Sequence, residues 1–581
     1  MKLSAYILSI SLVLILAIGC KDAPTAIPDS RKSDYALYDA NGGFHRFSTY
    51  NNKKAIVLWV QGNGCPIVRN ALADFNSIVE SYSEKGFQFF MINSNMQDDR
   101  AEIALEAKEF NFKTPVLVDN AQIVADELNI TSTAEAIVLH PTTREILFRG
   151  PINNRLDYEA QKDFASETYL KNALDAISKG KHVALKKEVT RGCTVTRLST
   201  IEKNKVLNYN DHIASILVNN CVTCHREEGR APWAMEDYQT VVGWSGMIRE
   251  VLLSKRMPPW KADPTIGNFK HDFSLADSNA RKIIRWIDQG MRSGSGKDTL
   301  QSLIFQPATW ERGIPDKIVV LQEENVPASK KIPYQYQSFS LDLTEDTWLQ
   351  GVEIIPGNPK LLHHVVLIHE NGYTSSPITD RKLRRFTDNF IALGAGANQS
   401  TFFPENTGVY LKKGEKLKIQ LHYTPIGKEA TDQTKIGFYY HKEKPEKWYY
   451  PLSPTNVTFT IPPHTGNVKI MAQDTIQQDI YIHSLMPHMH YRGKTIKMSV
   501  KKPDGTVIPL VSVPDFNMDW QWLYELKAPI FAPKGSLIIV EGVFDNTVQN
   551  PFNPDASKEI RFGIQSTDEM LTGFFNYTLA D

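Results

Sequence analysis

The pattern of hydrophobic residues in this chain changes near residue 310. Before that point apolar residues recur at both strand and helix spacing, whereas beyond it helical periodicity nearly vanishes and short alternating runs such as 416–423 take over. Alternation of this kind places every second side chain on one face of a sheet. With turn signals such as Asp504-Gly505, the C-terminal half predicts two antiparallel β-sandwiches, at 310–452 and 453–581.

Strands and helices alternate in the first part of the chain, between residues 36 and 186. This alternation predicts an α/β layer fold. The expected strands are the apolar runs at 55–60, 87–93, 115–119, 136–139 and 145–148.

Cys65 follows the first of these runs, in the sequence Gly-Asn-Gly-Cys-Pro-Ile-Val-Arg. A helix N-terminus stabilises a thiolate through its dipole and free N–H groups. The module resembles the thioredoxin and peroxiredoxin-like (redoxin) family, which implies that Cys65 is the attacking cysteine. Val68 replaces the second cysteine of the family's Cys-x-x-Cys motif, and Thr133-Ala134-Glu135 stands in place of its cis-proline, so an ordinary dithiol cycle is not expected.

Cys193 is a candidate resolving partner for Cys65, although spacing in the sequence cannot establish that pairing. The alternative is a structural domain whose thiol has no redox role.

Residues 221–225 read Cys-Val-Thr-Cys-His, the attachment signature of c-type haem. Cys221 and Cys224 would bond the haem vinyl groups, and His225 would provide one axial ligand. Met257, on a proline-rich loop, is the expected second axial ligand.

The surrounding residues 206–297 resemble class I cytochrome c, which implies an all-α domain. The string Met-Pro-Pro-Trp-x-Ala-Asp-Pro at 257–264 resembles a variety that is fused to redoxin and copper domains in bacterial proteins. Met247, within a helix-like stretch, is the alternative axial ligand. A redox disulfide or a zinc site is the alternative to haem, but the adjacent histidine disfavours both.

Histidines and one methionine in the C-terminal half are candidate metal ligands. They are His363 with His364, His422, His488 with His490, and Met570. Side chains two apart on a strand share a face, so His488 and His490 could reach one metal, whereas adjacent histidines need a bulge or twist to do so. Thioether sulfur prefers Cu(I) and imidazole serves both copper oxidation states, so this set favours copper over zinc.

The order of these motifs resembles the copper type II, ascorbate-dependent monooxygenases, the family of peptidylglycine and dopamine monooxygenases. The resemblance implies two jelly-roll-like sandwiches with a cleft between two coppers. It assigns an electron-transfer copper to His363, His364 and His422, and an oxygen-binding copper to His488, His490 and Met570. Met486 stands where peptide-amidating members have an arginine, so a peptide C-terminal carboxylate is not expected as the substrate. A metal-free structural descendant is the alternative.

The N-terminus has an export pattern, with Lys2 before an apolar run at 6–18 that is short for a membrane span. The run ends in Leu-Ala-Ile-Gly-Cys, which resembles a bacterial lipoprotein signal and implies lipidation of Cys20; an ordinary cleaved signal peptide is the alternative. We therefore expect an exported protein, lipid-anchored to a bacterial membrane and facing the periplasm or cell surface. The 65 basic and 65 acidic residues balance, so nucleic-acid binding is not expected.

Together these features predict an exported copper-dependent monooxygenase that hydroxylates a C–H bond of a small or peptide-like substrate with O₂. Its cofactors would be two copper ions and one covalently bound c-type haem, with the haem relaying electrons from a reductant or donor protein. The alternatives are an electron-transfer lipoprotein without oxygenase activity and a one-cysteine thiol peroxidase centred on Cys65. The predicted units are a signal peptide (1–20), a linker (21–35), a thioredoxin-like domain (36–186), a linker (187–205), a cytochrome c domain (206–297) and the two sandwiches.

Overall fold

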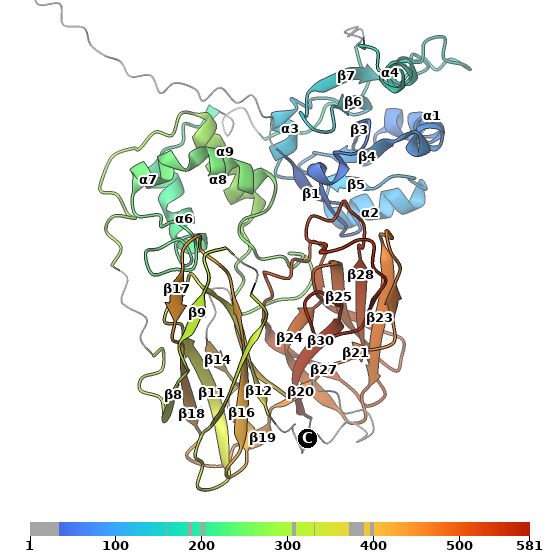
Figure 1. The fold of residues 1–581 in the computed structure, drawn as a ribbon. Helices are drawn as coiled ribbons and strands as arrows, with labels where there is room; N and C mark the ends of the chain where they lie inside the picture. The colour runs from blue at the N-terminus through green and yellow to red at the C-terminus, as the bar shows by residue number, and fades with distance from the viewer. Residues whose placement is uncertain are drawn as a thin grey trace, which may run out of the picture.

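Four units follow one another along the chain, and Figure 1 shows them in a computed structural model. They are an N-terminal α/β unit, a helical region, and two successive pairs of β-sheets, here called the first and second sheet pairs. The expected signal peptide and Cys20 lie outside the described residues. Within the described residues, no helix combines the length and the apolar character needed to cross a bilayer. The structure describes residues 34–158, 160–183, 189–198, 204–304, 310–329, 332–370, 389–395 and 400–580.

A five-stranded sheet in the order β5-β4-β3-β6-β7 forms the centre of the α/β unit. Its first three strands are parallel, and β6 and β7 are antiparallel to their neighbours. Every residue of β3 is buried, and its side chains alternate between a core shared with α1 and α4 and a core shared with α3. The elements are β1 (Ala36–Tyr38), β2 (Phe44–Arg46), β3 (Ala55–Gln61), α1 (Pro66–Tyr82), β4 (Phe87–Asn93), α2 (Arg100–Glu109), β5 (Val116–Val118), α3 (Ile123–Glu127), β6 (Glu135–Leu139), β7 (Ile146–Pro151) and α4 (Tyr169–Ser178).

The helical region packs against the α3 face of this sheet, because its apolar side chains belong to the same core as Ile56, Leu58 and Val60. Trp286 of its last helix is fully buried there. Asn208 caps the first turn of this region, since its side chain accepts a hydrogen bond from the Asp211 amide. The elements are the π-helical turn η3 (Tyr209–Ile213), α6 (Ala214–Asn220), α7 (Tyr238–Gly243), α8 (Ser245–Leu253) and α9 (Asp277–Asp288).

The first sheet pair contains one sheet in the order β10-β16-β12-β13 and one in the order β19-β15-β11-β18-β8, to which β14 is added through β11. A smaller sheet joins β17 and β9. The strands are β8 (Lys317–Val320), β9 (Glu324–Val326), β10 (Gln335–Ser340), β11 (Thr347–Ile355), β12 (Leu362–His369), β13 (Phe390–Ala395), β14 (Ser400–Phe402), β15 (Thr407–Leu411), β16 (Lys416–Tyr423), β17 (Ala430–Asp432), β18 (Lys435–Tyr440) and β19 (Lys447–Trp448).

The second sheet pair contains the orders β20-β30-β24-β27 and β23-β28-β25-β26, with β21 added to the first sheet through β30. The two sheet pairs lie side by side in Figure 1, and one apolar core runs through both. The strands are β20 (Tyr450–Leu452), β21 (Thr455–Asn456), β22 (Thr460–Ile461), β23 (Val468–Thr475), β24 (Ile480–His488), β25 (Gly493–Lys501), β26 (Val507–Val513), β27 (Tyr524–Ala532), β28 (Leu537–Phe544), β29 (Ile560–Arg561) and β30 (Leu571–Leu579).

The loop 257–273, between α8 and α9, fastens the helical region to two other units, and we call it the clamp. The Trp260 ring lies edge-on to Trp522 and Tyr524 of the second sheet pair, with centroids 5.4 and 4.8 Å apart. The Asp263 carboxylate accepts two hydrogen bonds from the Arg100 guanidinium of α2, at 2.8 and 2.9 Å. The Asp263 amide donates to the Ser512 carbonyl of β26, so this one residue contacts both neighbouring units.

Asp263→Asn should destabilise the assembly, because the Asp263 side chain is fully buried and its loss of charge leaves Arg100 without a counter-ion. Breaking a buried pair costs about 3–5 kcal/mol. Burial opposes ionisation of Asp263, yet the Arg100 hydrogen bonds hold its pKa below the ordinary value. The stabilisation is therefore complete above the ordinary carboxyl pKa and is lost as the pH falls through the lowered one.

Thermal unfolding and limited proteolysis of the clamp, followed from pH 7 downwards, measure this effect. Asp342→Asn is the matched control, since the Asp342–Lys317 pair is exposed and should change little. Equal unfolding curves for the two variants would contradict the prediction.

Candidate functional site

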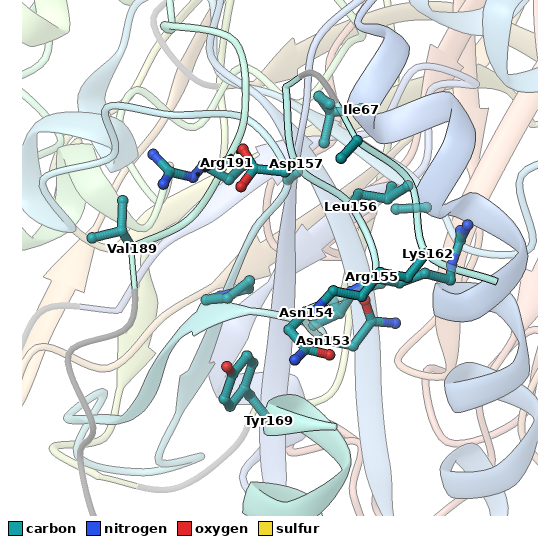
Figure 2. Close-up of a pocket in the computed structure, with 15 residues that line it drawn as sticks. Ile67, Asn153, Asn154, Arg155, Leu156, Asp157, Lys162, Tyr169, Val189 and Arg191 are labelled. Atoms are coloured by element: carbon teal, nitrogen blue, oxygen red, sulfur yellow. Dashed lines mark hydrogen bonds and ion pairs between the residues drawn. The ribbon is translucent and has the colours of Figure 1, made fainter. Parts of the chain in front are cut away.

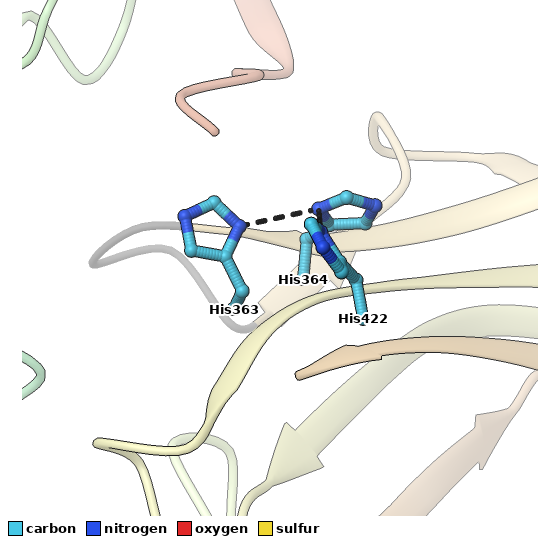
Figure 3. Close-up of side chains that lie close together, drawn as sticks. All are labelled: His363, His364 and His422. Atoms are coloured by element: carbon cyan, nitrogen blue, oxygen red, sulfur yellow. Dashed lines mark hydrogen bonds between the residues drawn. The ribbon is translucent and has the colours of Figure 1, made fainter. Parts of the chain in front are cut away.

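Three histidines from two neighbouring strands meet in the first sheet pair. His363 and His364 are in β12 and His422 is in β16, and one ligand nitrogen of each lies within 4.8 Å of the other two. Figure 3 shows the three rings converging. The Nδ1 atom of His364 lies 3.4 Å from Nδ1 of His363 and 3.3 Å from Nδ1 of His422. The sequence predicted that adjacent histidines need a bulge, and the β12–β16 register does shift between Leu362 and His364.

Burial keeps these imidazoles neutral. It lowers the pKa of His363 to about 3 and that of His364 well below its ordinary value, and the neighbouring His422 adds to both shifts. A neutral imidazole keeps a lone pair available for a metal, so this cluster fits a borderline cation.

His488, His490 and Met570, all from the second sheet pair, line one wall of a cavity that also has lining residues from the first sheet pair. The prediction placed both histidines on one strand, but β24 ends at His488 and His490 lies just beyond it. Their ring centroids are nevertheless 5.1 Å apart. Met570 reaches them because β30 begins at the next residue and pairs with β24, with Thr572 opposite His488.

Contacts of Nδ1 determine which ring nitrogen of both histidines stays available for a metal. The Nδ1 of His488 donates to the Gln521 side-chain oxygen at 2.5 Å, and the Nδ1 of His490 lies 3.4 Å from the Asp568 carbonyl. Both contacts leave Nε2 with its lone pair. The buried carboxyl group of Glu569, whose pKa burial raises to about 8, accepts hydrogen bonds from the His490 and Arg492 amides, which fixes the backbone beside Met570.

One cavity of about 360 Å³ connects the two groups, since its lining includes His364 together with His488, His490 and Met570. The two groups of predicted ligands therefore face each other across a single space. The three converging imidazoles of His363, His364 and His422 fit copper at one position. At the other, two imidazoles whose Nδ1 atoms contact amide and carbonyl oxygens, together with the Met570 thioether, fit copper as well.

The turn Cys221–His225 directly follows α6, and the amides of Cys224 and His225 both donate to the Cys221 carbonyl. The Nδ1 of His225 donates to the Trp233 carbonyl at 3.1 Å, which leaves Nε2 for an axial bond. Trp244, stacked on Trp233, is 40% exposed and provides an apolar surface beside the turn. This arrangement fits a covalently attached haem.

Met257 lines a separate cavity of about 200 Å³, together with Leu252, Leu275 and Ala280. Its role as the second axial ligand stays a prediction. Met247, the alternative, is half exposed on α8.

The sulfur atoms of Cys65 and Cys193 lie 2.7 Å apart. Cys65 is the N-cap of α1, as the sequence predicted, and is buried. Thr133, in place of the usual cis-proline, links the two cysteines, because its hydroxyl lies 3.1 Å from the Cys65 sulfur and accepts a hydrogen bond from the Cys193 amide.

The segment 189–198, expected to be linker, is instead joined to the Cys65 site by an isolated β-bridge and by backbone hydrogen bonds. Ser132 and Thr194 form an antiparallel bridge, and the Val195 amide donates to the Thr131 carbonyl. This backbone pairing delivers Cys193 to Cys65. A side chain at Gly192 would meet the Thr133 carbonyl at 1.9 Å, so the close approach requires glycine there.

The two thiols differ in acidity. Burial opposes ionisation of Cys65, but hydrogen bonds from Cys193, Thr133 and the Val68 amide outweigh it and lower its pKa. Burial and the neighbouring Cys65 raise the pKa of Cys193 to about 11. A cavity of about 270 Å³, shown in Figure 2, adjoins this site through Ile67 and Ala134.

Several supporting residues were not identified from the sequence. Gln521 and Glu569 act through contacts between segments that are distant in the sequence, and Arg230, whose Nη1 donates to the His363 carbonyl at 2.5 Å, crosses between units. The Trp-Gln-Trp string around Gln521 was the one available signal.

Comparison with known proteins identifies one of the four units. Residues 28–148 match the AhpC/TSA family, so the N-terminal α/β unit is a redoxin-like domain of the oxidoreductase type. No curated protein matches the chain.

Solved structures resemble this unit at low identity. A hypothetical protein from Sinorhizobium meliloti is 22% identical, with 29% of this chain and 94% of that chain covered and a TM-score of 0.27. Peroxidoxin BcpB from Mycobacterium tuberculosis is 16% identical, with 26% and 96% covered and a TM-score of 0.21. The exposed lipoprotein thioredoxin Etrx1 from Streptococcus pneumoniae is 18% identical, with 25% and 98% covered and a TM-score of 0.20.

Proposed function

We propose that the two sheet pairs form a copper-dependent monooxygenase in an exported, lipid-anchored protein. The observation that carries this proposal is the single cavity lined by His364 from one ligand group and by His488, His490 and Met570 from the other. The overall reaction would be R–H + O₂ + 2 e⁻ + 2 H⁺ → R–OH + H₂O. Copper, when bound, would supply the one-electron steps and the activation of O₂.

The residues of the chain would position and shield this chemistry. Gln521 orients the His488 ring, and Glu569 holds the backbone that carries both His490 and Met570. The predominantly apolar cavity wall would exclude water from the reacting atoms. His363, His364 and His422 would hold the copper that passes on the second electron.

Met570→Ala should abolish substrate-dependent O₂ uptake while copper at His363, His364 and His422 persists. Replacing even an outer partner of a metal ligand costs 10–100-fold, so a loss of at least about 100-fold is expected for a direct ligand. Oxygen-electrode assays, combined with copper analysis and electron paramagnetic resonance, separate the two effects.

Met471→Ala provides the control, because Met471 is half exposed on β23 and does not line the cavity. Undiminished O₂ uptake in Met570→Ala would contradict the proposal. Bound copper and haem without any substrate-dependent uptake in the unchanged protein would favour the electron-transfer alternative.

We further propose that electrons enter through the haem-attachment turn. Arg230 follows this turn, and the amide of the next residue, Ala231, donates to the Cys224 carbonyl at 3.1 Å. The Arg230 guanidinium in turn donates to the His363 carbonyl, so a short path of bonds links Cys224 to the three-histidine group. Burial lowers the pKa of Arg230 to about 10, which leaves it charged at neutral pH.

Arg230→Gln should slow electron transfer from reduced haem to copper without changing the haem content. Stopped-flow absorbance of haem reoxidation in the anaerobic, copper(II)-loaded protein measures this rate. Lys282→Ala, an exposed change on α9, should leave the rate unchanged. If haem reduction in the unchanged protein never leads to copper reduction, the relay is wrong.

A second activity, thiol redox chemistry in the redoxin-like domain, is favoured by the 2.7 Å approach of Cys65 and Cys193. The Cys65 thiolate would attack a peroxide and release water or an alcohol, leaving a sulfenic acid. Attack by the Cys193 thiol would then form the disulfide and release a second water.

Cys193→Ala should raise the pKa of Cys65, because the largest hydrogen bond to its thiolate is removed, and should end disulfide formation. Thiolate absorbance at 240 nm, measured as a difference from Cys65→Ser, reports the first effect, and thiol counting after peroxide treatment reports the second. Peroxide consumption that survives Cys65→Ser would end this proposal.

A further inference from the structure

The cavity between the sheet pairs has walls from both, and its lining is mainly aliphatic and aromatic. At about 360 Å³ it lies at the small end of the range of ligand pockets. Its apolar residues are Val366, Ile368, Phe390, Leu393, Met486, Ile564 and Phe574.

These apolar side chains do not simply complete the main core. Phe390, Leu393 and Met486 form a small buried cluster of their own, separate from the core that runs through both sheet pairs. Phe574 packs against this cluster, and its ring lies 5.5 Å from Phe390 and 6.0 Å from His488. An apolar surface therefore extends directly to the second ligand group.

Charge is almost absent from the lining. Lys418 is its one residue with a permanent charge, and Glu370 lies 3.6 Å from the Lys418 ammonium as a counter-ion. No carboxylate is among the described lining residues. The nearby Arg492 is buried and directs its guanidinium to Asn546 and to backbone carbonyls.

The polar groups that remain in the lining are neutral. Tyr334, Tyr336, Gln420 and Gln521 contribute hydroxyl and amide groups, and the Gln420 amide already donates to the Tyr336 hydroxyl at 2.7 Å. Burying an ionised ligand without a counter-ion carries a large desolvation penalty, whereas a hydroxyl or carbonyl can be satisfied by such groups.

We propose that the cavity binds an uncharged, predominantly apolar small molecule carrying at most a hydroxyl or carbonyl group. The inference rests on the proposed function in one respect only, which is that this molecule is the substrate to be hydroxylated. Binding itself requires only the walls of the cavity. Among the described lining residues no free counter-ion faces the space, so the charged ends of peptides and amines are excluded.

A matched ligand series tests this selectivity in the copper-free full-length protein. The probes are 4-phenylbutan-1-ol, 4-phenylbutyrate and 4-phenylbutylamine, which share one apolar body and differ in charge. Isothermal titration calorimetry at pH 7 should show the alcohol binding at least about tenfold more tightly than either ion. Its binding should carry a negative heat-capacity change, because apolar surface is buried.

Two variants place a cation in the lining. Phe574→Lys should weaken binding of the alcohol and make the carboxylate the preferred ligand. Ile564→Lys should also shift the ligand preference toward the carboxylate. The fold should tolerate this change more readily, because Ile564 is 54% exposed. Phe552→Lys, at a position that is 49% exposed and outside the lining, should leave all three affinities unchanged.

Equal or tighter binding of either ion to the unchanged protein, or no binding of any probe, would overturn the inference. The inference would also be overturned if Phe574→Lys and Ile564→Lys showed the same ligand preference as Phe552→Lys. The failure of the proposed function looks different: the copper-loaded protein would show no O₂ uptake with any neutral substrate, while the copper-free protein kept its preference for the alcohol.

Discussion

The clamp at 257–273 fixes the relative positions of the units. Trp260 packs against aromatic rings of the second sheet pair, Asp263 binds the Arg100 guanidinium of the redoxin-like domain, and the Lys261 ammonium contacts the Asp515 carboxylate at 2.7 Å. Asp515, in the second sheet pair, also accepts a hydrogen bond from Arg46 of the redoxin-like domain. Because the clamp belongs to the helical region, these contacts also hold that region where Arg230 can reach His363.

Strand pairing then determines which side chains meet. His364 pairs with His422 across β12 and β16, and His488 pairs with Thr572, close to Met570. His364 and His422, 58 positions apart in the sequence, thus become neighbours through antiparallel register, and Met570 is brought to the same cavity as His488 because it directly precedes β30. The burial that follows keeps the imidazoles neutral, and this is the state in which they can bind a metal.

The sequence allowed the α/β unit and the β-rich half to be predicted, because hydrophobic periodicity is a local signal. The assignment of the two histidine groups to copper stays a prediction. The sequence did not predict that His490 lies beyond the end of β24. A His-x-His pattern is the same whether both histidines are in the strand or the second one lies just past its end. Cys193 was assigned to a linker because backbone pairing with Thr131–Thr133 leaves no hydrophobic pattern. The clamp was interpreted only as a source of the haem ligand, since contacts such as Trp260 with Trp522 join residues 262 positions apart.

The adjacent pair His363 and His364 suggests how electron entry and substrate can be kept apart. Neighbouring residues of a strand point to opposite sides, and the bulge before His364 lets both rings approach one point. His364 lines the cavity, whereas His363 is not in its lining and its carbonyl accepts the hydrogen bond from Arg230 of the helical region. A charged donor can therefore contact the ligand group from outside without entering the apolar cavity. In the proposed monooxygenase reaction, which consumes electrons and protons, this separation would let electrons arrive without placing a charge in the cavity.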